Sequence, residues 1–69
     1  MKLEQLTGLV ADKRLKVKHG HDHTIARFVR FGRKRNQGVF LIVQKYDMRN
    51  NTFGNDVTIS PDDVMQVYG

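Results

Sequence analysis

Three adjacent cations are the residues of this sequence best placed for chemistry. Arg33, Lys34 and Arg35 lie within residues 32–38, a polar segment that begins and ends with glycine and separates two strand-like stretches. Such a segment is typical of a hairpin loop. Like charges this close repel one another and add nothing to fold stability, so they favour binding to a polyanion. The simpler interpretations are a solvated turn that serves solubility and contact with an acidic protein.

The positive charge of the chain is concentrated in its first half. Twelve Lys and Arg against seven Asp and Glu give a net charge of +5. Residues 13–35 contain nine of the basic residues and one acidic residue, Asp22, so this segment carries +8 and the remainder −3. In a compact fold such a segment predicts a positive surface that attracts a polyanion over about a Debye length, ~8 Å at physiological salt.

A strand with cations on one face is predicted directly before Gly20. Leu15 and Val17 alternate with Lys16 and Lys18, which is the pattern of a half-buried strand. Because alternate residues of neighbouring strands point to the same sheet face, these lysines can extend the basic surface of the hairpin loop together with Arg27 and Arg30, if the strand register allows it.

A second strand is predicted at residues 24–31, which are rich in β-branched and aromatic side chains. Strict alternation places Arg27 and Phe31 on one face and Phe28 and Arg30 on the other. We expect both phenylalanines in the core, because a domain this small needs its aromatic side chains inside.

Two further aromatic residues flank a polar turn predicted at residues 47–55. Tyr46 and Phe53 are candidates for stacking on a nucleic-acid base, which contributes about 1–3 kcal/mol per base. The candidate nucleic-acid-binding residues are Lys16, Lys18, Arg27, Arg30, Arg33, Lys34, Arg35, Tyr46 and Phe53.

Metal binding and catalysis have little support. His19, His21 and His23 alternate as a metal site on a strand would require, but Gly20 between them favours a turn with ordinary loop histidines. The chain has no cysteine, which excludes disulfides and cysteine-based zinc sites. The adjacent pair Asp62–Asp63 is explained by favourable charge at a helix N-terminus. With no phosphate-binding glycine loop or nucleophile motif, the sequence predicts a non-enzyme without cofactor or metal.

The first element of the chain is an N-terminal segment whose sequence pattern fits more than one kind of secondary structure. Leu3, Leu6 and Val10 recur at helical spacing and predict a short helix before residue 13. Gly8 weakens this prediction and leaves a loose turn or a strand as the alternative.

The second half of the chain predicts three more strands. Residues 39–46 are apolar on both faces, as in a central strand covered on both sides. A strand through Val57 and Ile59 ends at Pro61, where a serine cap starts one helical turn, and a last strand follows from Val64.

This order of elements resembles the small five-stranded barrels of the Src-homology, Tudor, KOW and Sm-like group. The resemblance covers residues 15–68 and is carried most clearly by residues 56–67, which read DVTISPDDVMQV and look like the one-turn helix between the last two strands of such barrels. It implies a mainly β fold, a five-stranded antiparallel barrel, and binding to RNA, DNA, proline-rich peptides or modified tails. The KOW glycine motif is absent and Asn55-Asp56 stands where Sm proteins carry Arg-Gly, so no family site residue is transferred.

The whole chain, residues 1–69, is predicted to be a single domain and reads as a complete short reading frame. Its longest apolar run, residues 39–43, is five residues, against the roughly 20 needed to span a bilayer. The absence of an apolar secretory stretch adds to the expectation of a soluble, cytoplasmic protein.

These observations support two main hypotheses. The first is a nucleic-acid-binding protein of low sequence specificity, acting on DNA or RNA, whose cationic hairpin and adjoining strand face contact phosphates. The alternative is a protein-binding adaptor or inhibitor, of viral or mobile-element origin given its size, that docks on an acidic surface of a host enzyme. A lesser hypothesis is a homo-oligomer formed through an exposed strand edge.

Overall fold

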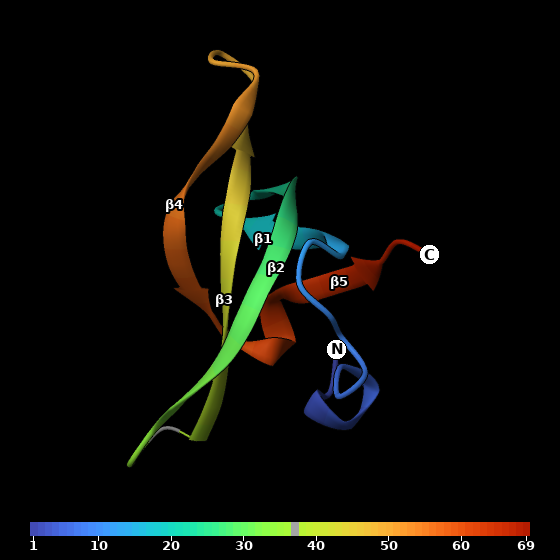
Figure 1. The fold of residues 1–69 in the computed structure, drawn as a ribbon, viewed down its shortest axis with the longest axis vertical. Coiled ribbons are helices and arrows are strands. Elements are labelled where there is room, and N and C mark those ends of the chain that lie inside the picture. The colour runs from blue at the N-terminus through green and yellow to red at the C-terminus, as the bar shows by residue number, and fades with distance from the viewer. Residues whose placement is uncertain (37) are drawn as a thin grey trace.

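The computed structural model describes residues 1–36 and 38–69 and places them in one five-stranded antiparallel sheet with two 3₁₀ turns (Figure 1). The elements are η1 (Leu3–Gln5), β1 (Arg14–His19), β2 (Asp22–Lys34), β3 (Gly38–Asp47), β4 (Thr52–Ile59), η2 (Pro61–Asp63) and β5 (Val64–Val67). Gln37, in the predicted hairpin loop, lies outside the described residues. The mainly β architecture, the five strands and the single turn of helix before the last strand are therefore confirmed.

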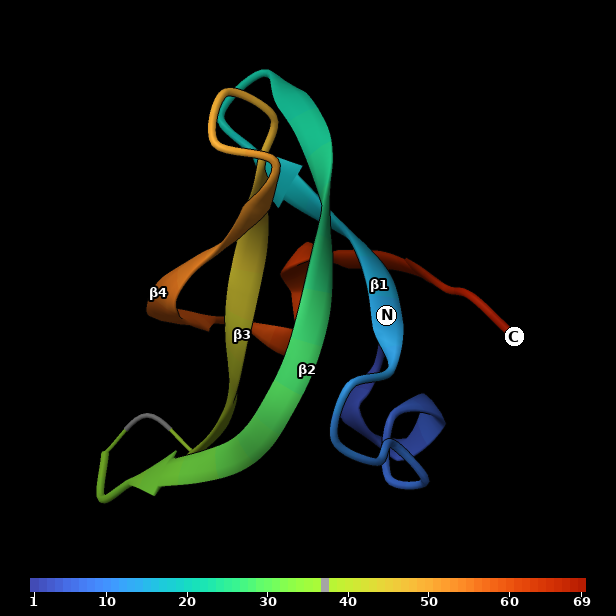
Figure 2. The ribbon, with the colours of Figure 1, turned by 45° about the horizontal axis from the view of Figure 1, so that its top comes forward.

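The sheet differs from the prediction in that it does not close into a barrel. Its strand order is β4-β3-β2-β1-β5, and in the described part of the chain the edge strands β4 and β5 do not pair with each other. Ser60 and Pro61 start η2, which carries the chain away from β4, and β5 then pairs with the free side of β1. The long strand β2 is strongly curved (Figure 2). Its first part pairs with β1 and its second part with β3.

The core lies on the inner face of this curved sheet. Alternation along β1, β2 and β3 places Leu15, Val17, Ala26, Phe28, Leu41 and Val43 there, and Leu6, Ile59 and Val64 complete the cluster from other segments. Phe28 is buried, so its predicted core position is confirmed. Phe31 is only half-buried and packs against the cluster, with its ring centre 4.8 Å from that of Phe28.

The central strand of the sheet is β2, whereas the sequence pattern had indicated β3. In β3, Leu41 and Val43 are buried on the inner face and Ile42 is buried on the outer face, but Val39 and Phe40 are only half-buried. The apolar run therefore corresponds to burial on both faces only in the middle of β3.

The predicted N-terminal helix is reduced to the single 3₁₀ turn η1. Leu6, which follows it, is completely buried, whereas Leu3 is 37% and Val10 67% exposed. A segment this short, with Gly8 inside it, does not sustain a helix, because isolated helices below about 12–15 residues are marginal. The segment is instead tied to the sheet, because the amino group of Met1 donates hydrogen bonds to the carbonyls of Pro61 (3.0 Å) and Val64 (2.7 Å).

The β3–β4 connection is tighter than the predicted turn at residues 47–55, because β4 already begins at Thr52. The carboxylate of Asp47 accepts hydrogen bonds from the backbone N–H of Arg49 (2.9 Å) and the side-chain amide of Asn50 (2.8 Å). Asn51 takes φ +52, a conformation that asparagine tolerates better than most residues. Within residues 1–36 and 38–69, no helix has the length and apolar character needed to cross a membrane.

The β1–β2 connection leads to a prediction about stability. Gly20 has φ +62, as the first residue of a favoured two-residue hairpin turn often does, and a side chain there is strained by about 1–2 kcal/mol. Gly20→Ala should therefore lower the free energy of unfolding by about 1–2 kcal/mol. Gly8 is the matched control, because it has open space around it and no positive φ. Urea denaturation of both variants checks this, and equal effects at the two glycines would contradict the strained turn.

Candidate nucleic-acid interface

Five cations share the outer face of β1 and β2. In the register of the two strands Arg14 lies opposite Arg27, and Lys16 lies opposite Ile25, while the residues between them point into the core. We call the side chains of Arg14, Lys16, Lys18, Arg27 and Arg30 the basic face. Of its five members, the sequence prediction named Lys16, Lys18, Arg27 and Arg30.

The position of Arg30 corrects the sequence prediction, which placed it on the face opposite Arg27. A bulge between Phe28 and Arg30 inserts one extra residue into β2 relative to β3. As a result Arg27 lies opposite Gln44 and Arg30 lies opposite Ile42, two residues on the same side of β3. A β-bulge shifts the alternation of side chains by one position, so both arginines face outward.

The guanidinium groups of Arg14 and Arg27 lie against one aromatic ring, and we call these two residues the arginine pair. The Arg14 Cζ atom is 4.7 Å, and the Arg27 Cζ atom 4.5 Å, from the centre of the Phe53 ring. Contacts of this length are cation–π interactions, which contribute about 0.5–1 kcal/mol at exposed sites. Phe53, predicted as a base-stacking residue, is thus placed to hold two cations.

Hydrogen bonds fix the arginine pair further. Arg27 Nε donates to Gln44 Oε1 (2.6 Å), and Gln44 Nε2 donates to Asp56 Oδ1 (2.8 Å), so the amide stands between the cation and the carboxylate. Arg14 Nη1 donates to the carbonyl of Asp12 (2.6 Å), whose own backbone N–H is bonded to the carbonyl of Phe28. Both guanidinium groups are held before any ligand arrives, with N–H donors left over, since each guanidinium has five.

The cations of the basic face are not neutralised by ion pairs. Among residues 1–36 and 38–69 the one ion pair joins His23 Nδ1 to Asp22 Oδ1, 3.6 Å apart. Asp47 is engaged in its own turn and Asp56 in the bond to Gln44. The positive charge of β1 and β2 therefore stays available for an external anion.

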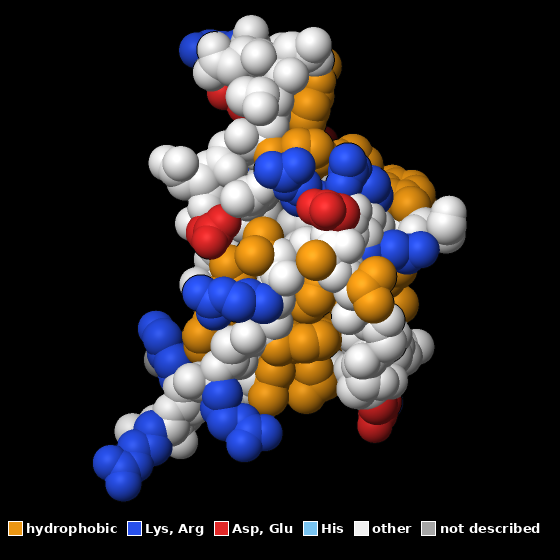
Figure 3. All heavy atoms as spheres, viewed as in Figure 1, with side chains coloured by type: hydrophobic (Ala, Val, Ile, Leu, Met, Phe, Trp, Pro, Cys, Tyr) orange, Lys and Arg blue, Asp and Glu red, His pale blue; other side chains and the backbone are white. Residues whose placement is uncertain are grey.

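The hairpin cations lie at one end of the molecule. Arg33, Lys34 and Arg35 are all exposed, and Lys34 Nζ is 5.9 Å from the centre of the Phe40 ring. The β2–β3 hairpin projects from the sheet at the lower left of Figure 1, and basic side chains gather along it in Figure 3. β2 carries Arg33 and Lys34 of this hairpin as well as the arginines of the basic face. In the β2–β3 register Lys34 lies on the side of Arg30, and Arg33 lies on the other side.

The aromatic residues Tyr46 and Phe53 lie together beside the basic face. They are opposite each other in the β3–β4 register, and their rings are in edge-to-face contact with centres 5.4 Å apart. The Tyr46 hydroxyl donates a hydrogen bond to Asn51 Oδ1, which sets the orientation of its ring.

One member of the site was missed by the sequence reasoning, namely Arg14. The signal that would have found it is the alternation with Lys16 and Lys18, extended by one step before Leu15. That alternation does not indicate the contact with Phe53, because the two residues belong to strands that are separated in the sheet by β2 and β3.

The three histidines are not brought together. The Lys45 ammonium lies 3.2 Å from His19 Nδ1, and His23 pairs with Asp22. In the part of the chain that the structure describes, no group of three or more potential ligands is arranged to hold a metal ion.

The arrangement as a whole is suited to binding anions. Preoriented guanidinium groups donate paired hydrogen bonds to the oxygens of a phosphate or carboxylate, and lysines beside them add charge without strict geometry. Comparison with known proteins finds no matching family model, curated protein sequence or solved structure.

Proposed function

We propose that this protein binds nucleic acid through phosphate contacts, with low sequence specificity. The observation that carries the proposal is the arginine pair, two guanidinium groups on one phenylalanine ring with no acidic ion-pair partner in the described structure. Bringing two like charges to one ring is unfavourable by itself, and a phosphate placed between them removes that cost.

The distribution of the cations favours a long polyanion over a small one. From Arg27 to Lys34, β2 advances about 23 Å at roughly 3.3 Å per residue, and cations occur along that whole distance. A nucleic-acid strand presents phosphates repeatedly over such a length, whereas a small anion engages only one or two of these side chains. Phosphate contacts carry no sequence information, which is the reason for the low specificity.

The salt dependence of binding tests the role of the hairpin. With about five phosphate contacts, log K should fall against log salt with a slope of about −4 to −5 on duplex DNA. Replacing Arg33, Lys34 and Arg35 with alanine should weaken binding and flatten the slope by about 2–3, because each lost contact removes about 0.9. Fluorescence anisotropy of a labelled duplex over a salt series measures both quantities.

The matched control removes three cations from other positions, namely Lys2, Lys45 and Arg49. It changes the net charge by the same amount and should leave most of the slope intact. Equal flattening by the two triple variants would show that binding depends on net charge alone and would remove the hairpin from the proposed interface.

A further inference from the structure

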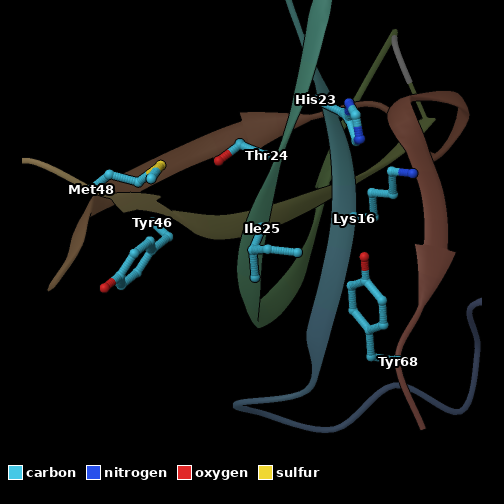
Figure 4. A pocket seen from close by; sticks show the side chains of 7 residues that line it. All are labelled: Lys16, His23, Thr24, Ile25, Tyr46, Met48 and Tyr68. Atoms are coloured by element: carbon cyan, nitrogen blue, oxygen red, sulfur yellow. The ribbon is translucent and has the colours of Figure 1, made fainter. Parts of the chain in front are cut away.

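A hollow of about 350 Å³ lies on the outer face of the sheet, next to the arginine pair. Ile25 forms part of its floor, and Tyr46 and Tyr68 stand on either side of that residue (Figure 4). Lys16 and Met48 also line it, and the Met48 side chain is 86% exposed. The hollow therefore offers aromatic and aliphatic walls with a cation at its border.

The fold positions the Tyr46 side chain and the Tyr68 backbone. Tyr46 is fixed by its edge-to-face contact with Phe53 and by the hydrogen bond from its hydroxyl to Asn51. The backbone N–H of Tyr68 donates to the carbonyl of Arg14 (3.0 Å), which places Tyr68 beside β1 just after β5 ends. The Tyr46 ring, which is already positioned, loses little conformational entropy when a flat ligand stacks on it.

The hollow and the arginine pair lie next to each other on the outer face of the sheet. Arg14 lies opposite Arg27, and the next outward-facing pair along the strands is Lys16 opposite Ile25. Two residues of a strand span about 7 Å, which lets one nucleotide place its base in the hollow and a flanking phosphate at the arginine pair.

We propose that this hollow binds an unpaired nucleobase, and that the nucleic acid recognised by this protein is therefore single-stranded. The inference rests on the proposed function and adds the class of ligand. Tyr46 and Tyr68 supply the π surfaces, Ile25 the apolar floor, and Lys16 with the arginine pair the charges that hold the adjoining backbone. Bases of any kind present a π surface, so this contact also tolerates many sequences.

Single strands are favoured over duplexes for a geometric reason. In a duplex the bases are paired and stacked, and a base must be unstacked before it enters a pocket in a protein surface. A single strand presents its bases already free to stack on aromatic side chains, with its phosphates free to follow a cationic face.

The test uses three labelled ligands of equal length, namely an oligothymidylate, an oligouridylate and an abasic deoxyribose-phosphate strand. All three should bind, and the two base-bearing strands should bind about tenfold to a hundredfold more tightly than the abasic one, from stacking of one base. The chain has two tyrosines and no tryptophan, and both tyrosines line the hollow. Fluorine NMR of protein labelled with meta-fluorotyrosine should therefore show both signals shifting with the base-bearing strands and much smaller shifts with the abasic strand.

The variant Tyr68→Leu keeps an apolar side chain and removes one aromatic wall. It should bring the affinity for oligothymidylate close to that for the abasic strand, while Met65→Ala on β5, outside the hollow, leaves the difference intact. Equal affinity of the unmodified protein for base-bearing and abasic strands, without tyrosine shifts, would overturn the base-binding inference and leave the proposed function standing. Tighter binding of a duplex of the same length would also overturn it. Failure of every strand and of the duplex to bind would overturn both proposals.

Discussion

Replacing Leu6 with alanine should lower the free energy of unfolding by about 2–5 kcal/mol, the range found for large-to-small substitutions at fully buried positions. Leu6 has no exposed surface and belongs to the same cluster as Leu15, Val17 and Phe28. A domain of this size rarely has more than about 3–5 kcal/mol of total stability, so a substantial unfolded population is expected at room temperature.

The effect of Leu6 is large because the sheet is open. In a closed barrel the strands themselves surround the core, whereas here the N-terminal segment covers part of the inner face. Alanine at position 6 leaves a cavity that the surrounding side chains fill only partly, since the backbone at this point is held by hydrogen bonds to Leu3 and Leu9.

Urea denaturation followed by circular dichroism measures this loss, and Leu3→Ala is the control. Leu3 lies in the same segment but is 37% exposed, and its truncation should cost no more than about 1 kcal/mol. A similar loss for the two variants would mean that the N-terminal segment stabilises the protein through its backbone contacts and that burial of Leu6 is unimportant.

The second large effect is expected for nucleic-acid binding. Replacing Arg14 and Arg27 together with glutamine should weaken binding at least about a hundredfold, because each charge-assisted hydrogen bond to a phosphate is worth about 1.5–3 kcal/mol. The slope of log K against log salt should flatten by about 1.4–1.8, the value for two contacts on single strands and on duplexes respectively. Anisotropy titrations over a salt series report both values.

The arginine pair should contribute more per residue than the hairpin cations. Its guanidinium groups are already oriented by the Phe53 ring, by Gln44 and by the carbonyl of Asp12, so less side-chain freedom is lost on binding. The exposed side chains of the hairpin have no such hydrogen bonds in the described structure, and ordering them on a phosphate costs more entropy.

Phe53→Leu separates orientation from charge. It keeps both arginines and removes the ring that holds them, so the affinity should fall severalfold while the salt slope stays the same. A double substitution of the arginine pair with lysine should likewise keep the slope and lose affinity, because lysine has no planar donor fork. If Phe53→Leu bound as tightly as the unmodified protein, the ring would have no part in positioning the cations.

Much of the fold was predictable from local patterns. The alternation of Leu15 and Val17 with Lys16 and Lys18 defines β1 and its two faces, because successive side chains of any strand point to opposite sides. The turn after Ile59 was equally predictable, since the serine side chain accepts the backbone N–H of Asp62 and proline fits only the start of such a turn.

The N-terminal segment and the closure of the sheet were not predictable in this way. The spacing of Leu3, Leu6 and Val10 is helical, but only Leu6 of the three is fully buried, and the other side chains of this segment that pack against the core are Met1 and Leu9. Whether an edge strand pairs with another edge depends on the total curvature of the sheet, which residues within one strand do not specify.

The sequence by itself determined that the cations are concentrated in residues 13–35 and that they alternate with apolar residues along strands. Only the tertiary structure decided which of them share a face, because the bulge between Phe28 and Arg30 shifts the alternation and brings Arg30 to the side of Arg27. The tertiary structure also decided that Phe53 of β4 meets Arg14 of β1. Alternation is a property of the local backbone, whereas register, bulges and contacts across several strands arise from pairing between distant segments.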